Sequence, residues 1–216
     1  MKKIWLAAAL AAAVLCGGTA EAAQPGLTDH PAQIETEAPQ MPADCEAKLP
    51  VWKGGTALQR ARVNAAVEAE AARFAARLTD LRTHGEVSGW LSWQAGRADA
   101  ELVSFVLYES VYFKGAAHPS TTVVGLTFDA KGEPVARKEA LARAVPQTAE
   151  DINAAIERQG KERDLMLFRP EWRTVQGWPQ EFYVGADGRL YFIFQQYDIA
   201  PYAAGWIAID AGPWTS

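Results

Sequence analysis

Two short stretches of the chain hold the side chains whose types could do chemistry. Residues 112–122 read "YFKGAAHPSTT", and residues 195–206 read "QQYDIAPYAAGW". The first contains His118 and the second Asp198, and an imidazole beside a carboxylate is a pairing that general acid–base catalysis uses. One hypothesis is therefore a hydrolase or deacetylase that uses His118 with Asp198. The alternative is that both side chains bond to the backbone of their own loops and hold two turns in shape.

The same stretches are rich in tyrosine, which offers an apolar ring and a hydroxyl to a ligand. Gly115 and Gly205 permit sharp bends, and Pro119 and Pro201 stiffen the chain beside them. Loops of this composition are typical of binding sites as well as of tight turns. The candidate ligand-binding residues are Tyr112, His118, Tyr197, Asp198 and Tyr202.

The rest of the sequence holds none of the common catalytic or metal-binding motifs. It has no H-E-x-x-H, no metal-type pair of cysteines, no G-x-S-x-G and no phosphate-binding glycine loop. Glu109 and Asp198 form a further carboxylate pair only if the fold brings them together. We therefore predict no metal site and no cofactor, and we favour a non-catalytic protein over an enzyme.

The first 22 residues have the pattern of a secretory signal peptide. Lys2 and Lys3 precede an apolar run of 12 residues over 4–15, and an A-x-A site ends at Ala22. A membrane-spanning helix needs about 20 apolar residues, so this run is too short, and no later segment is longer. The sequence predicts an exported protein, periplasmic or extracellular, with no transmembrane segment in the mature chain. The alternatives are an uncleaved anchor and a lipoprotein attached through Cys16.

The charge of the mature chain excludes some partners. Removing Lys2, Lys3 and Glu21 leaves 19 basic and 25 acidic residues, a net charge of −6 with neutral histidines. This balance argues against nucleic acid and against anionic membrane surfaces. Cys45 becomes the only cysteine, so no disulfide within the chain is expected.

The hydrophobic pattern divides the chain into ordered segments. Residues 23–46, with four prolines and several acids, predict a flexible acidic leader. Apolar residues at helical spacing predict helices over about 56–81 and 148–163, each with a threonine as N-cap. Alternating Val-, Phe-, Tyr- and Trp-rich runs predict strands at 86–95, 101–113, 121–129, 180–184, 189–195 and 206–210.

This order of elements predicts an α+β fold with a largely antiparallel sheet packed against two main helices. The folded part spans residues 47–216 as one compact unit or as two closely joined lobes. These lobes are an upstream helix-bearing lobe at about 47–100 and a second lobe at about 101–214. The run Tyr191 to Phe194 predicts a central strand that is buried on both faces.

Several segments together resemble a known family. They are "YFKGAAHPSTT", "GLTFDAKGE", "FRPEWRT", "EFYVGADGRLYFIFQQYDIAPYAAG" and "AIDAGPW". They resemble the RsiV-like extracellular domain, a domain of unknown function shared by RsiV-type anti-sigma factors and the N-terminal region of PdaC-type peptidoglycan deacetylases. The resemblance covers about residues 47–214 and includes the glycine-alanine-histidine turn and the terminal tyrosine-acid-isoleucine-alanine-proline-tyrosine loop.

The resemblance implies a sandwich-like domain that binds a ligand and does not catalyse a reaction. It implies a lysozyme-like protein or peptidoglycan as the ligand, since the RsiV branch binds lysozyme. This chain differs from the family at Gln195 and Gln196, where an aromatic residue and a proline are common. We expect it to have neither a sigma-binding segment nor a deacetylase domain. We therefore expect an exported binding module of the cell envelope, with a purely structural envelope protein as a further alternative.

Overall fold

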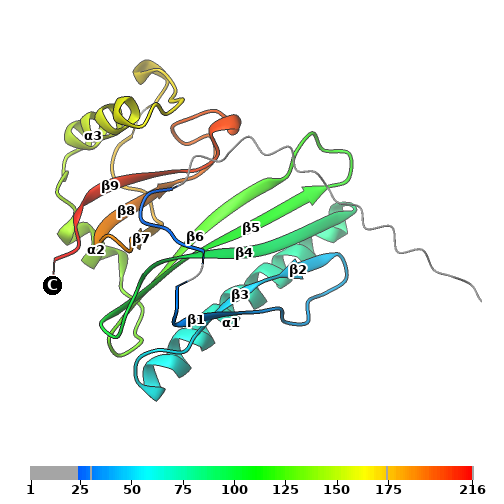
Figure 1. Cartoon of the computed structure of the whole chain (residues 1–216). Coiled ribbons are helices and arrows are strands. Elements are labelled where there is room, and N and C mark those ends of the chain that lie inside the picture. The colour runs from blue at the N-terminus through cyan, green and yellow to red at the C-terminus, as the bar shows by residue number, and fades with distance from the viewer. Residues whose placement is uncertain (1–23, 30, 174, 216) are drawn as a thin grey trace, which may run out of the picture.

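The protein forms four layers, arranged helix, sheet, sheet, helices (Figure 1). The computed structural model describes residues 24–29, 31–173 and 175–215. The predicted signal peptide at 1–22, with Cys16, lies outside the described residues, as does His30. No helix within the described ranges is long and apolar enough to cross a membrane.

The first two layers are a long helix and a four-stranded sheet. Helix α1 (Ala57–Leu81) has Thr56 as its N-cap, and the Thr56 side chain accepts a hydrogen bond from the Gln59 backbone N–H. It packs on the sheet β2-β4-β5-β6, formed by β2 (Cys45–Ala47), β4 (Val87–Ala98), β5 (Leu102–Phe113) and β6 (Ser120–Asp129). Because side chains alternate along a strand, one face of β5 meets α1 and the other faces the third layer. The 3₁₀ turn η1 (Arg82–His84) ends the helix.

Two short strands lie within or at the end of residues 23–46, the segment predicted as a flexible leader. It contains β1 (Ile34–Glu37), which pairs antiparallel with β3 (Leu49–Trp52), and β2, which pairs parallel with β4. The prolines and acids made the segment look unable to fold. β1 and β2 are held by hydrogen bonds to β3 and β4, which follow later in the chain. β3 is itself fixed in the core, because Trp52 at its end is fully buried under α1.

The third layer is a second sheet that crosses the first at close range. It consists of β7 (Phe182–Val184), β8 (Arg189–Phe194) and β9 (Ile207–Pro213), all antiparallel with β8 in the centre. Glycines on the first sheet allow the approach: a Cβ at Gly125 would lie 1.9 Å from the Phe182 carbonyl oxygen, and one at Gly96 would lie 2.1 Å from that of Val184. The two sheets therefore pack through backbone as well as side chains.

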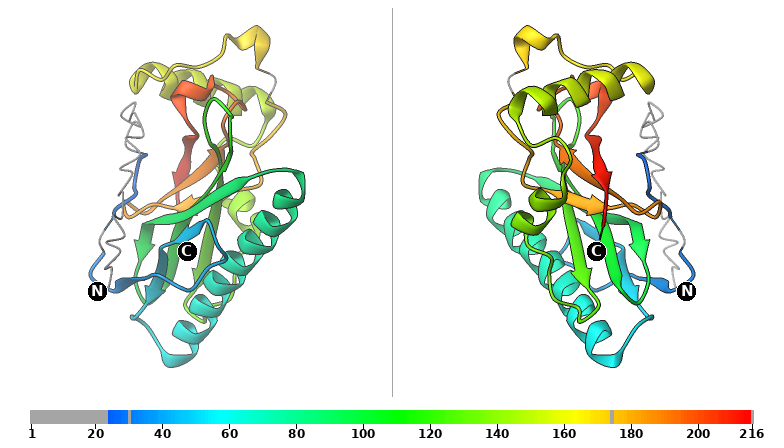
Figure 2. Two further views of the ribbon diagram at one scale, coloured as in Figure 1. Left: turned by 90° about the vertical axis from the view of Figure 1, so that its right-hand side faces the viewer. Right: turned by 90° about the vertical axis from the view of Figure 1, so that its left-hand side faces the viewer.

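The fourth layer is formed by α2 (Arg137–Arg143) and α3 (Ala149–Glu162) on the outer face of the second sheet (Figures 1 and 2). Leu190, Phe192 and Phe194 point toward these helices, whereas Tyr191 and Ile193 point toward the first sheet. All five are buried. The prediction that this strand is central and buried on both faces is confirmed.

The α+β class is also confirmed. Both predicted helices start after the predicted caps, Thr56 and Thr148, and end within a residue of the predicted ends. The sequence did not predict α2 or the short strands β1 to β3. β4 and β5 are neighbours in one sheet, so this sheet includes residues on both sides of position 100. The division into lobes stays a prediction.

Candidate functional site

The imidazole of His118 stacks on the phenol ring of Tyr202, with ring centroids 3.6 Å apart and planes 24° from parallel. His118 lies on the loop between β5 and β6, and Tyr202 begins the 3₁₀ turn η3 (Tyr202–Ala204) between β8 and β9. The Tyr202 hydroxyl donates to the Pro119 carbonyl oxygen at 2.9 Å, and His118 Nδ1 lies 3.1 Å from the same oxygen. The two stretches singled out in the sequence thus meet at one carbonyl.

Tyr197 stands at the edge of this stack on a tight turn. Its ring centroid is 6.1 Å from that of Tyr202, and its side chain is 57% exposed. Its φ is +70°, a backbone conformation that bulky side chains rarely adopt. Asp198 closes the turn, because its carboxylate accepts from the Gln195 backbone N–H at 2.7 Å. Asp198 therefore holds Tyr197 in an exposed position and does so through a backbone hydrogen bond.

Two glutamines join this turn to the first sheet. The Gln195 side chain accepts from the Val123 N–H at 2.9 Å and donates to the Val123 carbonyl at 2.8 Å. Gln196 Oε1 accepts from the Thr121 N–H at 3.2 Å. Both contacts lie on the edge of β6 that has no neighbouring strand in its sheet. They satisfy backbone groups that an open strand edge would otherwise expose, and they hold the two loops in register.

These residues surround a cavity of about 230 Å³. Its lining is aromatic or neutral and hydrogen-bonding, with no Asp, Glu, Lys or Arg, and comprises His118, Ser120, Thr121, Thr122, Gln195, Gln196, Tyr197 and Tyr202. Such a surface offers ring faces, hydroxyls and amides. We call it the His118–Tyr202 cavity.

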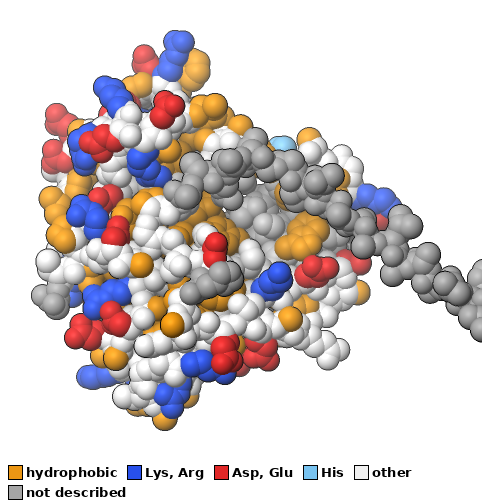
Figure 3. Space-filling model, viewed as in Figure 1, with side chains coloured by type: hydrophobic (Ala, Val, Ile, Leu, Met, Phe, Trp, Pro, Cys, Tyr) orange, Lys and Arg blue, Asp and Glu red, His pale blue; other side chains and the backbone are white. Residues whose placement is uncertain are grey.

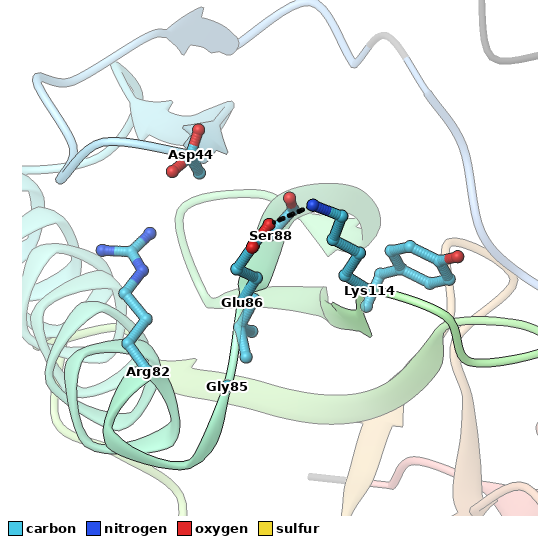
Figure 4. A pocket seen from close by; sticks show the side chains of 8 residues that line it. Asp44, Arg82, Gly85, Glu86, Ser88 and Lys114 are labelled. Atoms are coloured by element: carbon cyan, nitrogen blue, oxygen red, sulfur yellow. Dashed lines mark hydrogen bonds and ion pairs between the residues drawn. The ribbon is translucent and has the colours of Figure 1, made fainter.

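Tyr112 is not part of this group. It lines a separate cavity of about 430 Å³ at the start of β4, together with charged side chains from several elements. Figure 4 shows Glu86 paired with Lys114 on one side and Asp44 and Arg82 on the other. The structure thus brings together four of the five candidate residues around one turn and cavity, and leaves Tyr112 in a different, charged environment.

No hydrogen bond joins the side chains of His118 and Asp198 among the described residues. Each has a backbone group of its own loop as its described polar contact, the Pro119 carbonyl for His118 and the Gln195 N–H for Asp198. A general base and its partner must lie within hydrogen-bonding reach of each other. Glu109 does not meet Asp198 either: it is buried on the α1 side of β5 and ion-paired with Arg77 at 2.9 Å.

A carboxylate with a strongly raised pKa lies away from the cavity. Burial raises the pKa of Glu109 to about 7, and the nearby Glu70 carboxylate adds to this, although Arg77 and Arg73 act in the opposite direction. Because such an acid changes its protonation with pH in the folded state, it makes the stability of the fold depend on pH.

On the surface, Lys, Arg, Asp and Glu are interspersed over the face shown in Figure 3, with no extended area of one sign.

Sequence reasoning did not identify the polar lining of the His118–Tyr202 cavity. Ser120, Thr121 and Thr122 are the first three residues of β6, and Gln195 and Gln196 follow β8 directly. The only indication in the sequence was their position at the ends of predicted strands, because strand ends that lie side by side bring their residues together. Which strands lie side by side could not be predicted from the sequence.

The fold and cavity define an α+β protein of two stacked sheets with a small neutral cavity where their loops meet. Residues 136–210 match the family model described as "Protein of unknown function (DUF3298)". This segment runs from the start of α2 into β9 and includes the turn that carries Tyr197 and Tyr202. The match supports a domain of unknown function over this part of the chain, and the more specific RsiV-like assignment stays a prediction.

Two solved structures share the fold. One is a DUF3298 family protein from Pseudomonas aeruginosa PAO1, with a TM-score of 0.55 and 15% identity over 85% of this chain and 92% of that one. The other is a DUF3298 family member from Bacteroides fragilis, with a TM-score of 0.51 and 13% identity over 83% of this chain and 88% of that one. At these identities the likeness shows the fold. No curated protein sequence matches the chain.

Proposed function

We propose that this protein is an exported binding module of the cell envelope and that the His118–Tyr202 cavity is its ligand site. The observation that carries the proposal is the ready-made stack of His118 on Tyr202 beside the exposed ring of Tyr197. A binding surface that is already ordered loses little conformational entropy when the ligand arrives. The strained backbone of Tyr197 supports the same reading, because such strain concentrates at functional sites.

The chemistry of the lining favours a neutral ligand rich in hydroxyl groups. Aromatic rings provide apolar contact for the C–H faces of sugar rings, and the side chains of Gln195, Gln196 and Thr122 offer donors and acceptors. Apart from His118, the lining holds no ionisable side chain of the Asp, Glu, Lys or Arg type that would pair with a strongly charged ligand. The glycan chain of the cell wall has the required chemistry, so we assign peptidoglycan as the ligand.

The size of the cavity fits a repeating ligand. Its volume of about 230 Å³ is below the roughly 300–1,000 Å³ of cavities that enclose a whole small molecule. A polymer needs only one unit in the cavity while its neighbours lie across the surface. Tyr197 and the exposed loop that carries His118 supply such a surface beside the cavity.

The proposal can be tested by co-sedimentation of the mature protein with purified insoluble peptidoglycan. Wild type should sediment, and Tyr197→Ala and His118→Ala should each weaken binding by about tenfold or more, the loss expected when a stacked ring is removed. Tyr112→Ala is the matched control, since Tyr112 lies outside the cavity, and it should bind like wild type.

A parallel pull-down with lysozyme in solution and analysis of the supernatant for soluble products separate the alternatives. Capture of lysozyme in solution, without binding to peptidoglycan, would replace the glycan with a protein ligand. Release of soluble sugar or acetate from the pellet would indicate a hydrolase or deacetylase. Failure to bind either partner would leave a structural envelope protein, and the cavity proposal would be wrong.

A further inference from the structure

Part of one face of the first sheet extends beyond the second sheet. Val106 of β5 and Val123 of β6 point into the core between the two sheets. Because side chains alternate along a strand, Ser110 of β5 and Thr121 of β6 lie on this same face. In Figure 1 the start of β4 and the end of β5 project past β7, β8 and β9. The face is therefore covered at one end of the strands and open at the other.

A row of three side chains crosses the open end of this face. Ser110 is the register partner of Thr121, and their hydroxyl oxygens are hydrogen-bonded at 2.8 Å. Ser110 is also the register partner of Trp90 in β4. Side chains of register partners lie on the same face, and neighbouring strands are about 4.8 Å apart, so the three positions form a row roughly 10 Å long.

The row connects the His118–Tyr202 cavity to an exposed aromatic ring. At one end Thr121 lines that cavity. At the other end Trp90 is 38% exposed, and no ring stacks on its indole within the described part of the chain. The next pair along the strands, Ser88 and Tyr112, lines the charged cavity instead. The row itself contains no ionisable side chain, which continues the neutral chemistry of the His118–Tyr202 cavity.

We propose that the row from Thr121 to Trp90 is a second subsite for the same glycan chain, with the indole of Trp90 against the apolar face of a sugar unit. Aromatic rings suit such C–H faces, and the hydroxyls of Ser110 and Thr121 can bond to the sugar hydroxyls between the two aromatic sites. The inference rests on the proposed function. It adds the direction in which the polymer leaves the cavity, across β6 and β5 toward β4, and the need for a ligand longer than one unit.

Two ligands prepared from the same peptidoglycan test the proposal in titrations of the mature protein. They are long glycan strands, freed of peptide by an amidase, and the single disaccharide unit. A ligand that fills both subsites gains the contacts of each, so the strands should bind at least about tenfold more tightly than the disaccharide. Equal affinity for the two ligands would overturn the second subsite and leave the proposed function standing. Absence of binding to the strands and to intact peptidoglycan would overturn both.

Variants show whether the added affinity comes from Trp90. Trp90→Ala should weaken binding to the strands by about tenfold and binding to the disaccharide much less, because the indole contacts only the longer ligand. Trp90→Phe keeps an aromatic face and should retain most of the affinity. His118→Ala should weaken binding to both ligands.

Trp172→Ala is the matched control for Trp90→Ala. Trp172 lies in the 3₁₀ turn η2 (Pro170–Trp172), outside the row, and is 72% exposed. Its loss should leave the affinity for both ligands as in wild type. Affinity for the strands that Trp90→Ala leaves unchanged would refute the proposal.

Discussion

The stack of His118 on Tyr202 joins two loops that are far apart in the chain, since Pro119 and Tyr202 are separated by 83 positions. Pro119 links the pair because its carbonyl lies within hydrogen-bonding distance of both side chains. One loop belongs to the first sheet and the other to the second, so the cavity forms only when the sheets are stacked. A substitution that disturbs the packing of the sheets should therefore also disturb ligand binding. Only a conservative substitution that keeps the packing can test the contribution of one side chain to binding.

Tyr202→Phe should affect binding more than stability. The substitution keeps the ring on His118 and removes the hydroxyl that donates to Pro119, so the free energy of unfolding should fall by no more than ~1.5 kcal/mol, the usual net contribution of one hydrogen bond. Affinity for peptidoglycan should fall measurably. Urea denaturation and co-sedimentation check the two effects. A large loss of stability with unchanged binding would show that the stack is part of the framework.

Gly125→Ala should destabilise the contact between the sheets. The added Cβ would lie 1.9 Å from the Phe182 carbonyl oxygen, so β7 must move away from β6. We expect a loss of roughly 1–3 kcal/mol, as for other overpacked sites. Gly177→Ala is the control, since a Cβ there meets nothing within 4 Å. Equal urea midpoints for the two variants would mean that the sheets do not approach so closely in solution.

Gly205→Val tests the backbone of the second loop. Gly205 has φ +69° and ψ −152°, a region that is essentially limited to glycine. Valine should cost on the order of 1–3 kcal/mol through backbone strain. Thermal unfolding measures the loss. A variant as stable as wild type would show that this turn can adopt a different conformation.

Phe192→Ala should be among the most damaging single changes. Phe192 is fully buried in the central strand β8 and stacks on Trp178 with ring centroids 4.8 Å apart. Deletion of a buried phenyl ring costs about 3–5 kcal/mol. Trp172→Ala removes a larger ring that is 72% exposed and should change stability by no more than about 0.5 kcal/mol. Similar urea midpoints for the two variants would contradict the assignment of β8 to the core.

Glu109 should make stability fall as pH rises. Its pKa is raised to about 7 in the folded state, so between the ordinary value of 4.5 and about 7 the folded protein binds more protons than the unfolded one. The free energy of unfolding then decreases with increasing pH in that window, by on the order of 2 kcal/mol. Glu109→Gln should remove this part of the decrease. Glu101→Gln, which alters an exposed carboxylate, should leave it in place. Urea midpoints at pH 5, 6, 7 and 8 give the comparison, and parallel curves for wild type and Glu109→Gln would exclude Glu109 as the cause.

Much of the secondary structure could be predicted from the sequence because its determinants are local. Thr56 and Thr148 cap helices whose apolar residues recur at helical spacing, and both helices begin where the caps predict. The consecutive apolar residues of β8 indicated a strand buried on both faces, which is its place in the second sheet. α2 was missed because a helix of seven residues is stabilised mainly by packing, which leaves little local signal.

The site depended on contacts between distant segments, and only the tertiary structure decided these. The sequence singled out the two loops, but it could not tell that His118 stacks on Tyr202 while Tyr112, six residues before His118, lines a different cavity. That outcome follows from strand register and from the way the second sheet crosses the first. Arg173 has no local feature that distinguishes it from an exposed arginine. In the folded protein Arg173 is buried, and its Nε and Nη1 atoms have no hydrogen-bond partner among the described residues. Burial depends on how the layers pack and cannot be read from the residue type.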